Sequence, residues 1–194
     1  VTLIDAREVL EMTENILAIR RKKESSMVKT MMLARKGEVD AVLSCGNTGA
    51  YYASAMLFLK RIEGVEKSCL MAMMPTYSDN KVAMLDVGAN SENTAEQLKS
   101  FAIMGNAYAK NVLKITNPKI ALLNIGSEHH KGDEIHQETY KLLEDMQEIN
   151  FVGNIEGKEI LDGEVDVVVT DGFTGNVALK TIEGVAKVLV KSLK

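Results

Sequence analysis

Cysteine is scarce in this sequence, and neither sign of charge dominates it. Only 2 of the 194 residues are cysteines, so no disulfide framework is expected and a reducing compartment is indicated. The 23 basic residues are balanced by 27 acidic ones, which argues against a nucleic-acid partner. No apolar run has the length of a membrane span, and no segment has the pattern of a signal peptide. We therefore expect a cytoplasmic protein.

Several motifs that mark known reaction types are missing as well. The sequence has neither the GxGxxG fingerprint of dinucleotide-binding proteins nor a P-loop. It has no G-x-S-x-G elbow for a serine nucleophile. It also lacks HExxH and any Cys/His cluster with metal-ligand spacing. The sequence therefore predicts neither a metal ion nor another cofactor.

The stretch from Gly163 to Lys180 reads GEVDVVVTDGFTGNVALK and predicts a strand, a turn and a helix in succession. Val165 to Val169 is a β-branched run of the kind found in buried parallel strands. Residues 171–176 are rich in glycine and predict a turn, after which Val177 begins helical spacing. A helix entered through such a turn presents backbone N–H groups that favour an anion.

A similar unit, which again predicts a strand, a turn and a helix, occurs earlier in the chain. Residues 37–50 read GEVDAVLSCGNTGA, which is identical to GEVDVVVTDGFTGN at 8 of 14 positions. Any α/β protein can repeat such a turn, so the likeness also has a purely structural explanation. Because both copies keep the Thr-Gly pair that opens the helix, we favour one ligand held from two loops.

Predicted strands and helices alternate along the rest of the chain. Apolar runs predict strands at residues 1–4, 69–74, 81–86, 120–125 and 151–152. Helical spacing predicts helices in parts of 6–23, from a Ser25–Ser26 cap to Gly37, from Ala50 to about Leu59, from a Thr94–Gln97 capping box toward Leu113, over 134–146, and from Val177 to Lys194. This alternation predicts a three-layer α/β sandwich with a mostly parallel sheet, formed as a single core over residues 1–194.

Four of the predicted strands end in polar turns that contain glycine: SCGNTG, DVGAN, NIGSEHHKG and TDGFTGN. In a parallel sheet these turns meet at the carboxyl edge, where ligands bind. Lys131 supplies a point charge suited to a phosphate or an oxyanion, although an exposed lysine is the simpler interpretation. Asn176 supplies an uncharged donor, although it could equally be a helix cap. Asp86 and Asp171 either orient such donors or simply satisfy the backbone of their turns, and we favour the structural role.

Obvious nucleophiles are few in these turns. Cys45 lies in the first turn but has no histidine beside it, so we interpret it as a small packing residue. His129 and His130 adjoin Lys131 without forming a metal motif. The predicted site is therefore rich in amide, hydroxyl and ammonium donors. Such a site suits a reaction whose nucleophile is an anion taken from solution.

Seven motifs resemble, in the same order, those of the phosphate acyltransferase (PlsX) family of bacterial phospholipid synthesis: SCGNTGA, LDVGAN, FAIMGNAYAK, LLNIGSE, KGDE, INFVGNIEG and DGFTGNVALKTIEG. The resemblance runs from about Ala18 to Leu189, and the motifs together are far more specific than any one of them. Chains of that family extend further at both ends and usually have alanine at the position of Cys45, so we expect an internal fragment. The resemblance also implies a fold similar to that of the isocitrate and isopropylmalate dehydrogenases.

The resemblance implies the transfer of a fatty acyl group from acyl carrier protein to inorganic phosphate, which gives acyl phosphate. It assigns the catalytic roles to Lys131 and Asn176. Substrate and phosphate binding fall to groups of the turns: Asn47, Thr48, Gly49, Asp86, Asn90, Gly172, Thr174 and Gly175. The family is dimeric and peripherally membrane-associated, and its membrane-contacting tip would follow Lys194. No nucleic-acid partner is implied.

Other functions remain open from the residues alone. A short-chain phosphate acetyl- or butyryltransferase, or a decarboxylating dehydrogenase of similar fold, would use a related site. A non-catalytic module that binds carrier protein would keep the surface without the chemistry. The basic run from Arg20 to Lys23 is either a solvated helix end or a docking surface for an acidic partner, and Lys187, Lys191 and Lys194 compete with it for that docking role.

The last predicted helix has an apolar stripe and a basic face. The stripe consists of Ile182, Val185, Ala186, Leu189 and Leu193, and lysines fall largely on another face. A membrane surface and a protein core both fit this pattern. We expect the first turns to pack on the core, because the helix follows the buried strand directly.

Overall fold

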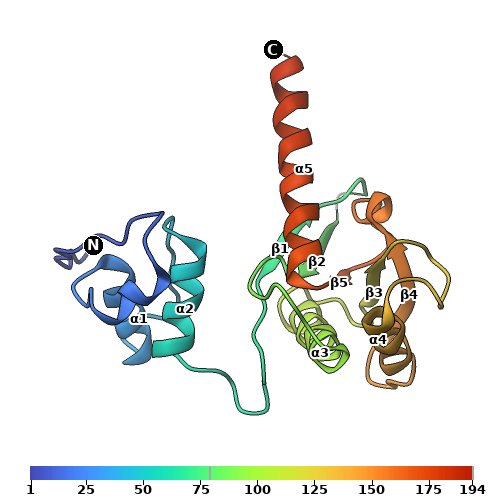
Figure 1. Cartoon of the computed structure of the whole chain (residues 1–194), viewed down its shortest axis with the longest axis horizontal. Coiled ribbons are helices and arrows are strands. Elements are labelled where there is room, and N and C mark those ends of the chain that lie inside the picture. Colours follow the sequence, from blue (N-terminus) through green and yellow to red (C-terminus); the bar gives the residue numbers. More distant parts are fainter. Residues whose placement is uncertain (79, 194) are drawn as a thin grey trace. The chain divides into compact units, whose positions relative to one another are not determined.

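The computed structural model describes residues 1–78 and 80–193, which form two compact units. The first unit is Val1–Val65 and the second is Glu66–Lys194. Figure 1 shows the helices and strands of each unit. The sequence predicted a single α/β core over residues 1–194, and whether the two units act as one core stays a prediction.

The first unit is helical. It contains a 3₁₀ helix, Ile16–Arg20, and two α-helices, α1 (Ser26–Arg35) and α2 (Thr48–Phe58). The predicted cap at Ser25 is confirmed, because its Oγ accepts from the Val28 N–H. A small core holds these helices together and includes Ile19, Met27, Val28 and Ala50.

The predictions of two strands in this unit are wrong. Residues 1–4 and 39–44 have no regular structure, and Leu43 is 89% exposed. A strand is stable only when a neighbouring strand takes up its N–H and C=O groups. Among the described residues of the first unit, the one β-bridge joins Glu8 to Ser25. The β-branched run before SCGNTG therefore has no strand to pair with in this unit.

The second unit is built on a five-stranded sheet with the order β1-β2-β5-β3-β4. The strands are β1 (Met71–Pro75), β2 (Lys81–Leu85), β3 (Lys119–Asn124), β4 (Asn150–Glu156) and β5 (Val167–Val169). β1 pairs with β2 antiparallel at the edge, and β2, β5, β3 and β4 run parallel. The strands predicted near these positions, and the mostly parallel sheet, are confirmed.

Helices cover both faces of this sheet, so that the second unit has three layers (Figure 1). On one face, alternate strand residues pack against α3 (Ala95–Asn111) and α4 (Glu134–Glu144). On the other face, Met84 and Val168 belong to a core against which the first turns of α5 (Gly172–Ser192) pack. Burial on both faces explains why the strands read as continuous apolar runs. The α/β class is confirmed.

The ends of α3 and α5 show where local sequence signals located a helix end correctly and where they did not. The capping box of Thr94 and Gln97 is present at the start of α3, as predicted. α5 begins at Gly172, five residues before the predicted start at Val177, because Asp171 caps it and the glycines continue as helix. It ends at Ser192; Lys194, the predicted end, lies outside the described residues.

The two halves of α5 differ in environment. Ala178, Leu179 and Ile182 pack on the core, so the prediction for the first turns is confirmed. Beyond Ile182 the apolar residues are exposed; Val185 and Leu189, for example, are 54% and 57% exposed. In Figure 1 this half of the helix extends past the sheet of its own unit.

Candidate functional site

Three of the four predicted turns meet at the carboxyl edge of the sheet. They follow β2, β3 and β5, which are parallel to one another, and they comprise residues 86–90, 124–132 and 170–176. The fourth turn, SCGNTG, lies in the first unit and leads into α2. The prediction that one ligand is held from both similar loops stays a prediction.

Asp86 organises the turn after β2. The residue is fully buried, and its Oδ1 accepts from the N–H groups of Leu70, Gly88 and Ala89 at 2.9, 3.2 and 3.0 Å. Its Oδ2 accepts from the backbone N–H and the side-chain Nδ2 of Asn90, at 2.9 and 2.8 Å. The carboxylate is thus surrounded by donors of its own loop. This arrangement favours an orienting role over direct contact with an anion.

Asn90 is similarly engaged. Besides Asp86, its Nδ2 donates to the Ser68 carbonyl at 2.8 Å, and the residue is 8% exposed. Both side chains therefore fix the shape of the turn after β2. Both side chains would therefore act on a ligand indirectly, by holding the backbone of this loop in place.

The start of α5 packs directly on this turn because three glycines leave no side chain between the two backbones. A Cβ at Gly172 would contact the Asn90 carbonyl oxygen, and one at Gly175 would contact the Asp86 carbonyl oxygen. Gly88, with φ of +126°, leaves room for the Asn176 side chain. The glycines that suggested a loop in the sequence thus serve close helix packing.

Asn176 reaches from α5 to the turn after β2. Its Nδ2 donates to the Val87 carbonyl at 3.2 Å, and the residue is half-buried. It does not cap the helix, because the cap is Asp171, whose Oδ1 accepts from the Thr174 N–H at 2.8 Å. One amide hydrogen of Asn176 is engaged in this contact, which fixes the side chain at the carboxyl edge.

Lys131 lies in the turn after β3, and two asparagine side chains fix this turn by hydrogen bonds to its backbone. Asn124 Nδ2 donates to the Lys131 carbonyl at 3.1 Å, and Asn154 Nδ2 donates to the Glu128 carbonyl at 2.9 Å. The ammonium of Lys131 is 3.9 Å from Glu128 Oε1, a long ion pair at a partly exposed site. Such a pair leaves the ammonium available to an anion.

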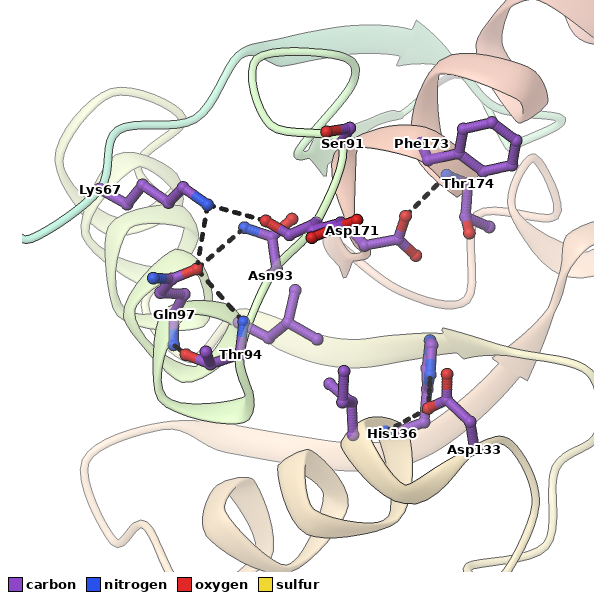
Figure 2. Close-up of a pocket in the computed structure, with 13 residues that line it drawn as sticks. Lys67, Ser91, Asn93, Thr94, Gln97, Asp133, His136, Asp171, Phe173 and Thr174 are labelled. Carbon is purple, nitrogen blue, oxygen red and sulfur yellow. Dashed lines mark hydrogen bonds and ion pairs between the residues drawn. The ribbon is translucent and has the colours of Figure 1, made fainter.

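Three helices of the second unit begin at one cavity of about 560 Å³. Their cap residues Thr94, Asp133 and Asp171 all line it, and each side chain accepts from a backbone N–H of its own first turn. We call this space the three-helix cavity (Figure 2). The positive ends of three helix dipoles therefore point toward one space, an arrangement that attracts anions.

Other groups that line the three-helix cavity change the electrostatic potential that the helix dipoles produce there. Lys67 brings a positive charge; its Nζ donates to the Glu92 carbonyl at 2.7 Å and to Gln97 Oε1 at 3.3 Å. The N–H of Gly172 is already bonded to Asn93 Oδ1 at 3.3 Å. The carboxylates of Glu92, Asp133 and Asp171 oppose an anion, so the balance depends on the dipoles, on Lys67 and on the uncharged donors.

Some of the turn residues that the sequence predicted for the site line this cavity, and others do not. Thr174 is exposed and lines it, and Asp171 lines it beside Thr174, whereas Lys131 and Asn176 do not. A second groove of about 360 Å³ adjoins it and shares Asp133, His136 and Thr174 with it. This groove runs along α5 past Val177 and Ala178.

Sequence reasoning missed the pair of Asp133 and His136. The His136 Nδ1 lies 2.7 Å from Asp133 Oδ1, the His136 side chain is 17% exposed, and its backbone N–H also donates to Asp133. These hydrogen bonds, from the ring first, lower the pKa of the Asp133 carboxyl. The spacing D-x-x-H at a helix start was the available signal, since an N-cap residue and the third residue after it lie on one face.

The remaining predicted residues lie in the first unit or outside the cavity. Asn47 caps α2, with Oδ1 accepting from the Ala50 N–H at 2.9 Å, and Thr48 and Gly49 form the first turn of that helix. Cys45 is exposed. His129 and His130 contact each other edge to face. Among residues 1–78 and 80–193, no three His, Cys, Asp or Glu side chains gather as metal ligands.

A family model described as "Fatty acid synthesis protein" matches residues 1–194. The chain belongs to this family. It is 47% identical over its whole length to a phosphate acyltransferase from Pediococcus pentosaceus and 46% identical to one from Lactococcus lactis subsp. lactis. The resemblance predicted from the seven motifs is therefore confirmed. The chain spans only 57% and 59% of the lengths of these two relatives.

Solved structures of two phosphotransacetylases are similar to this chain in fold. The EutD phosphotransacetylase from Staphylococcus aureus has a TM-score of 0.60 at 20% identity, over 88% of this chain and 62% of its own. A phosphotransacetylase from Streptococcus pyogenes has a TM-score of 0.57 at 18% identity, over 91% and 63%. At these identities the likeness concerns the fold alone. None of the described helices combines the length and apolar character needed to cross a membrane.

Proposed function

We propose that the complete protein transfers a fatty acyl group from acyl carrier protein to inorganic phosphate and so forms acyl phosphate for phospholipid synthesis. The observation that carries this proposal is the convergence of three helix starts on the three-helix cavity. A cavity of this kind favours a small anion, and the named relatives are phosphate acyltransferases.

The reaction asks little of covalent catalysis. Phosphate attacks the thioester carbonyl directly, and the thiol that leaves has a pKa of about 8.5, so it departs without a strong acid. The protein has to hold phosphate against the carbonyl and to stabilise the tetrahedral oxyanion. Polar donors on rigid helix starts are suited to both tasks.

In this proposal Lys131 and Asn176 are the catalytic residues. The ammonium of Lys131 is weakly paired with Glu128, and the amide of Asn176 is fixed by Val87. Neither lines the three-helix cavity, but both lie in turns of the same carboxyl edge, where a negative charge developing on the thioester carbonyl would be met by one cation and one neutral donor. Groups from the two similar loops and from the turn after β2 would bind phosphate and substrate: Asn47, Thr48, Gly49, Asp86, Asn90, Gly172, Thr174 and Gly175.

The proposal extends to architecture and surroundings. We expect the fold to be of the isocitrate/isopropylmalate dehydrogenase type, the protein to act as a homodimer in the cytoplasm, and a segment beyond Lys194 to contact the membrane peripherally. Acyl carrier protein would be the acidic partner. Apolar residues in the second half of α5 are exposed, Val188 to 63%. This exposure supports the proposal that the helix makes further contacts in the complete protein.

A direct test is to incubate the complete protein with palmitoyl carrier protein and phosphate. Hydroxylamine trapping should then detect acyl phosphate, formed only when phosphate is present. Thioester that stays intact would refute the proposal, and so would free palmitate that forms at the same rate without phosphate.

A short-chain phosphate acetyl- or butyryltransferase is the second candidate. It is favoured by the fold likeness to two phosphotransacetylases. The same assay with acetyl-coenzyme A separates the two functions. Faster turnover of acetyl-coenzyme A than of palmitoyl carrier protein would favour the second candidate.

A further inference from the structure

The pair of Asp133 and His136 lies where the proposed reaction has to move a proton. At neutral pH the phosphate nucleophile still carries a proton, and the thiolate that leaves has to acquire one. A group that accepts the first proton and returns it to sulfur would serve both steps. Histidine is the side chain best suited to this exchange near neutral pH.

The geometry leaves one nitrogen of the His136 ring for this purpose. Nδ1 lies 2.7 Å from Asp133 Oδ1, and the ring lines both the three-helix cavity and the adjoining groove. The Asp133 carboxyl has a lowered pKa, so it is ionised at neutral pH and accepts the Nδ1 proton. Nε2 of a neutral ring is then the basic nitrogen. Figure 2 shows the pair below Thr174 in the view drawn.

We propose that His136, oriented by Asp133, is the catalytic residue that relays the proton from phosphate to the leaving sulfur. This inference rests on the proposed function. A phosphate oxygen forms a bond to the carbonyl carbon while the phosphate proton passes to Nε2. The carbon–sulfur bond then breaks with its electron pair on sulfur, and Nε2 gives the proton to that sulfur. Acyl thioester and hydrogen phosphate thus become acyl phosphate and thiol, with charge and protons balanced.

The charges that face His136 are of both signs. Asp133 is on its own helix, Asp171 is at the start of α5, and Lys67 and Glu92 line the wall that leads to α3. The cavity that the ring lines therefore contains three carboxylates and one ammonium. A base in this place is active only when Nε2 is unprotonated, so protonation of Nε2 would stop the relay.

The test uses two substitutions that preserve the fold. His136→Gln keeps a helix-forming side chain that cannot relay a proton, and Asp133→Asn keeps the helix cap but favours the wrong tautomer. His130→Gln is the matched control, because His130 precedes Asp133 by three residues and does not line the three-helix cavity. Unchanged thermal unfolding of all three variants would show that folding is intact.

In the complete protein, His136→Gln should lower kcat by roughly 100-fold with little change in the KM for phosphate, and Asp133→Asn should lower kcat in the same direction. The acidic limb that phosphate itself contributes to the pH profile should remain in every variant. A second acidic limb should be present in the wild type and in His130→Gln and be lost in His136→Gln.

Two outcomes would overturn the inference. If the wild type forms acyl phosphate while His136→Gln retains its kcat and its pH profile, only the role of His136 fails. If the wild type forms no acyl phosphate, the proposed function fails and the relay fails with it.

Discussion

At the scale of single residues, the two proposed catalytic side chains contribute little to folding. Lys131 makes a 3.9 Å ion pair at a partly exposed site, and Asn176 makes one hydrogen bond of 3.2 Å. A functional effect of replacing them can therefore be separated from an effect on stability.

We predict that Lys131→Ala and Asn176→Ala each reduce turnover of palmitoyl carrier protein by about 100-fold, the usual scale for losing an oxyanion donor. Steady-state rates of acyl phosphate formation by the complete protein provide the measurement. Lys141→Ala, at an exposed position on α4, is the control and should keep the wild-type rate. Near wild-type turnover by either variant would remove that residue from the catalytic set.

The two cysteines should differ in reactivity because only one is protected by its surroundings. Burial first, and then the negative charge of Asp86, raises the pKa of the Cys69 thiol to about 12, whereas Cys45 is exposed. The thiolate is the reactive form, and at pH 8 about one Cys69 thiol in ten thousand would be ionised.

Iodoacetamide at pH 8 should therefore modify Cys45 in the native protein and leave Cys69 intact. Mass spectrometry of peptides gives the result, and treatment in denaturant should modify both. Equal labelling of the two cysteines in the native protein would contradict the buried position of Cys69.

At the scale of elements, the junction of α5 with the turn after β2 depends on the absence of side chains. A Cβ at Gly175 would collide with the Asp86 carbonyl and with Thr170, whereas a Cβ at Gly184, in the same helix, meets nothing within 4 Å. The two positions thus form a matched pair with opposite expectations.

Gly175→Ala should destabilise the protein by about 1–3 kcal/mol through overpacking. Gly184→Ala should stabilise it by roughly 0.5–1 kcal/mol, because alanine is the better helix former. Urea denaturation of both variants measures the difference. Equal midpoints would show that α5 does not pack against this turn as closely as described.

The same helix and the strand before it show how much of the local structure could be predicted from the sequence. The Val167–Val169 strand and the helix after it were predictable because β-branched runs and helical spacing are local signals. The start of α5 was not predictable in this way, because Gly172 and Gly175 read as a turn until their contacts with Asn90 and Asp86 are known. Residues 39–44 failed for a related reason, since a strand depends on a partner that its own sequence does not specify.

The candidate site divides along similar lines. Parallel strand order brought the turns with Asp86, Lys131 and Asn176 to one edge, as the alternation of elements predicted. The three-helix cavity and its His136 could not be located, because helices distant in sequence converge there. That one ligand is held from both the Asn47 loop and the Thr174 loop stays a prediction.

At the scale of the whole molecule, the proposed partner is acidic and requires a basic surface. Arg20, Arg21 and Lys23 are exposed, whereas Lys22 is bound to Glu14 at 2.7 Å and to the Val9 carbonyl. The first three charges are therefore the ones available for docking.

We predict that the double substitution Arg20→Glu and Arg21→Glu weakens binding of acyl carrier protein and flattens its dependence on salt. Titrations of the complete protein at several ionic strengths measure both effects, and Lys187→Glu with Lys191→Glu on α5 makes the same change of charge in the competing cluster. Unchanged affinity at low salt in the first variant would move the docking surface away from this run.

The central claim is that phosphate itself is the acyl acceptor, and one measurement tests it most directly. The complete protein is given palmitoyl carrier protein and radiolabelled inorganic phosphate, and both labelled acyl phosphate and free carrier-protein thiol are counted. The proposed mechanism predicts that the two appear in equal amounts and that neither forms without phosphate. Release of thiol with no label in an acyl product would contradict it.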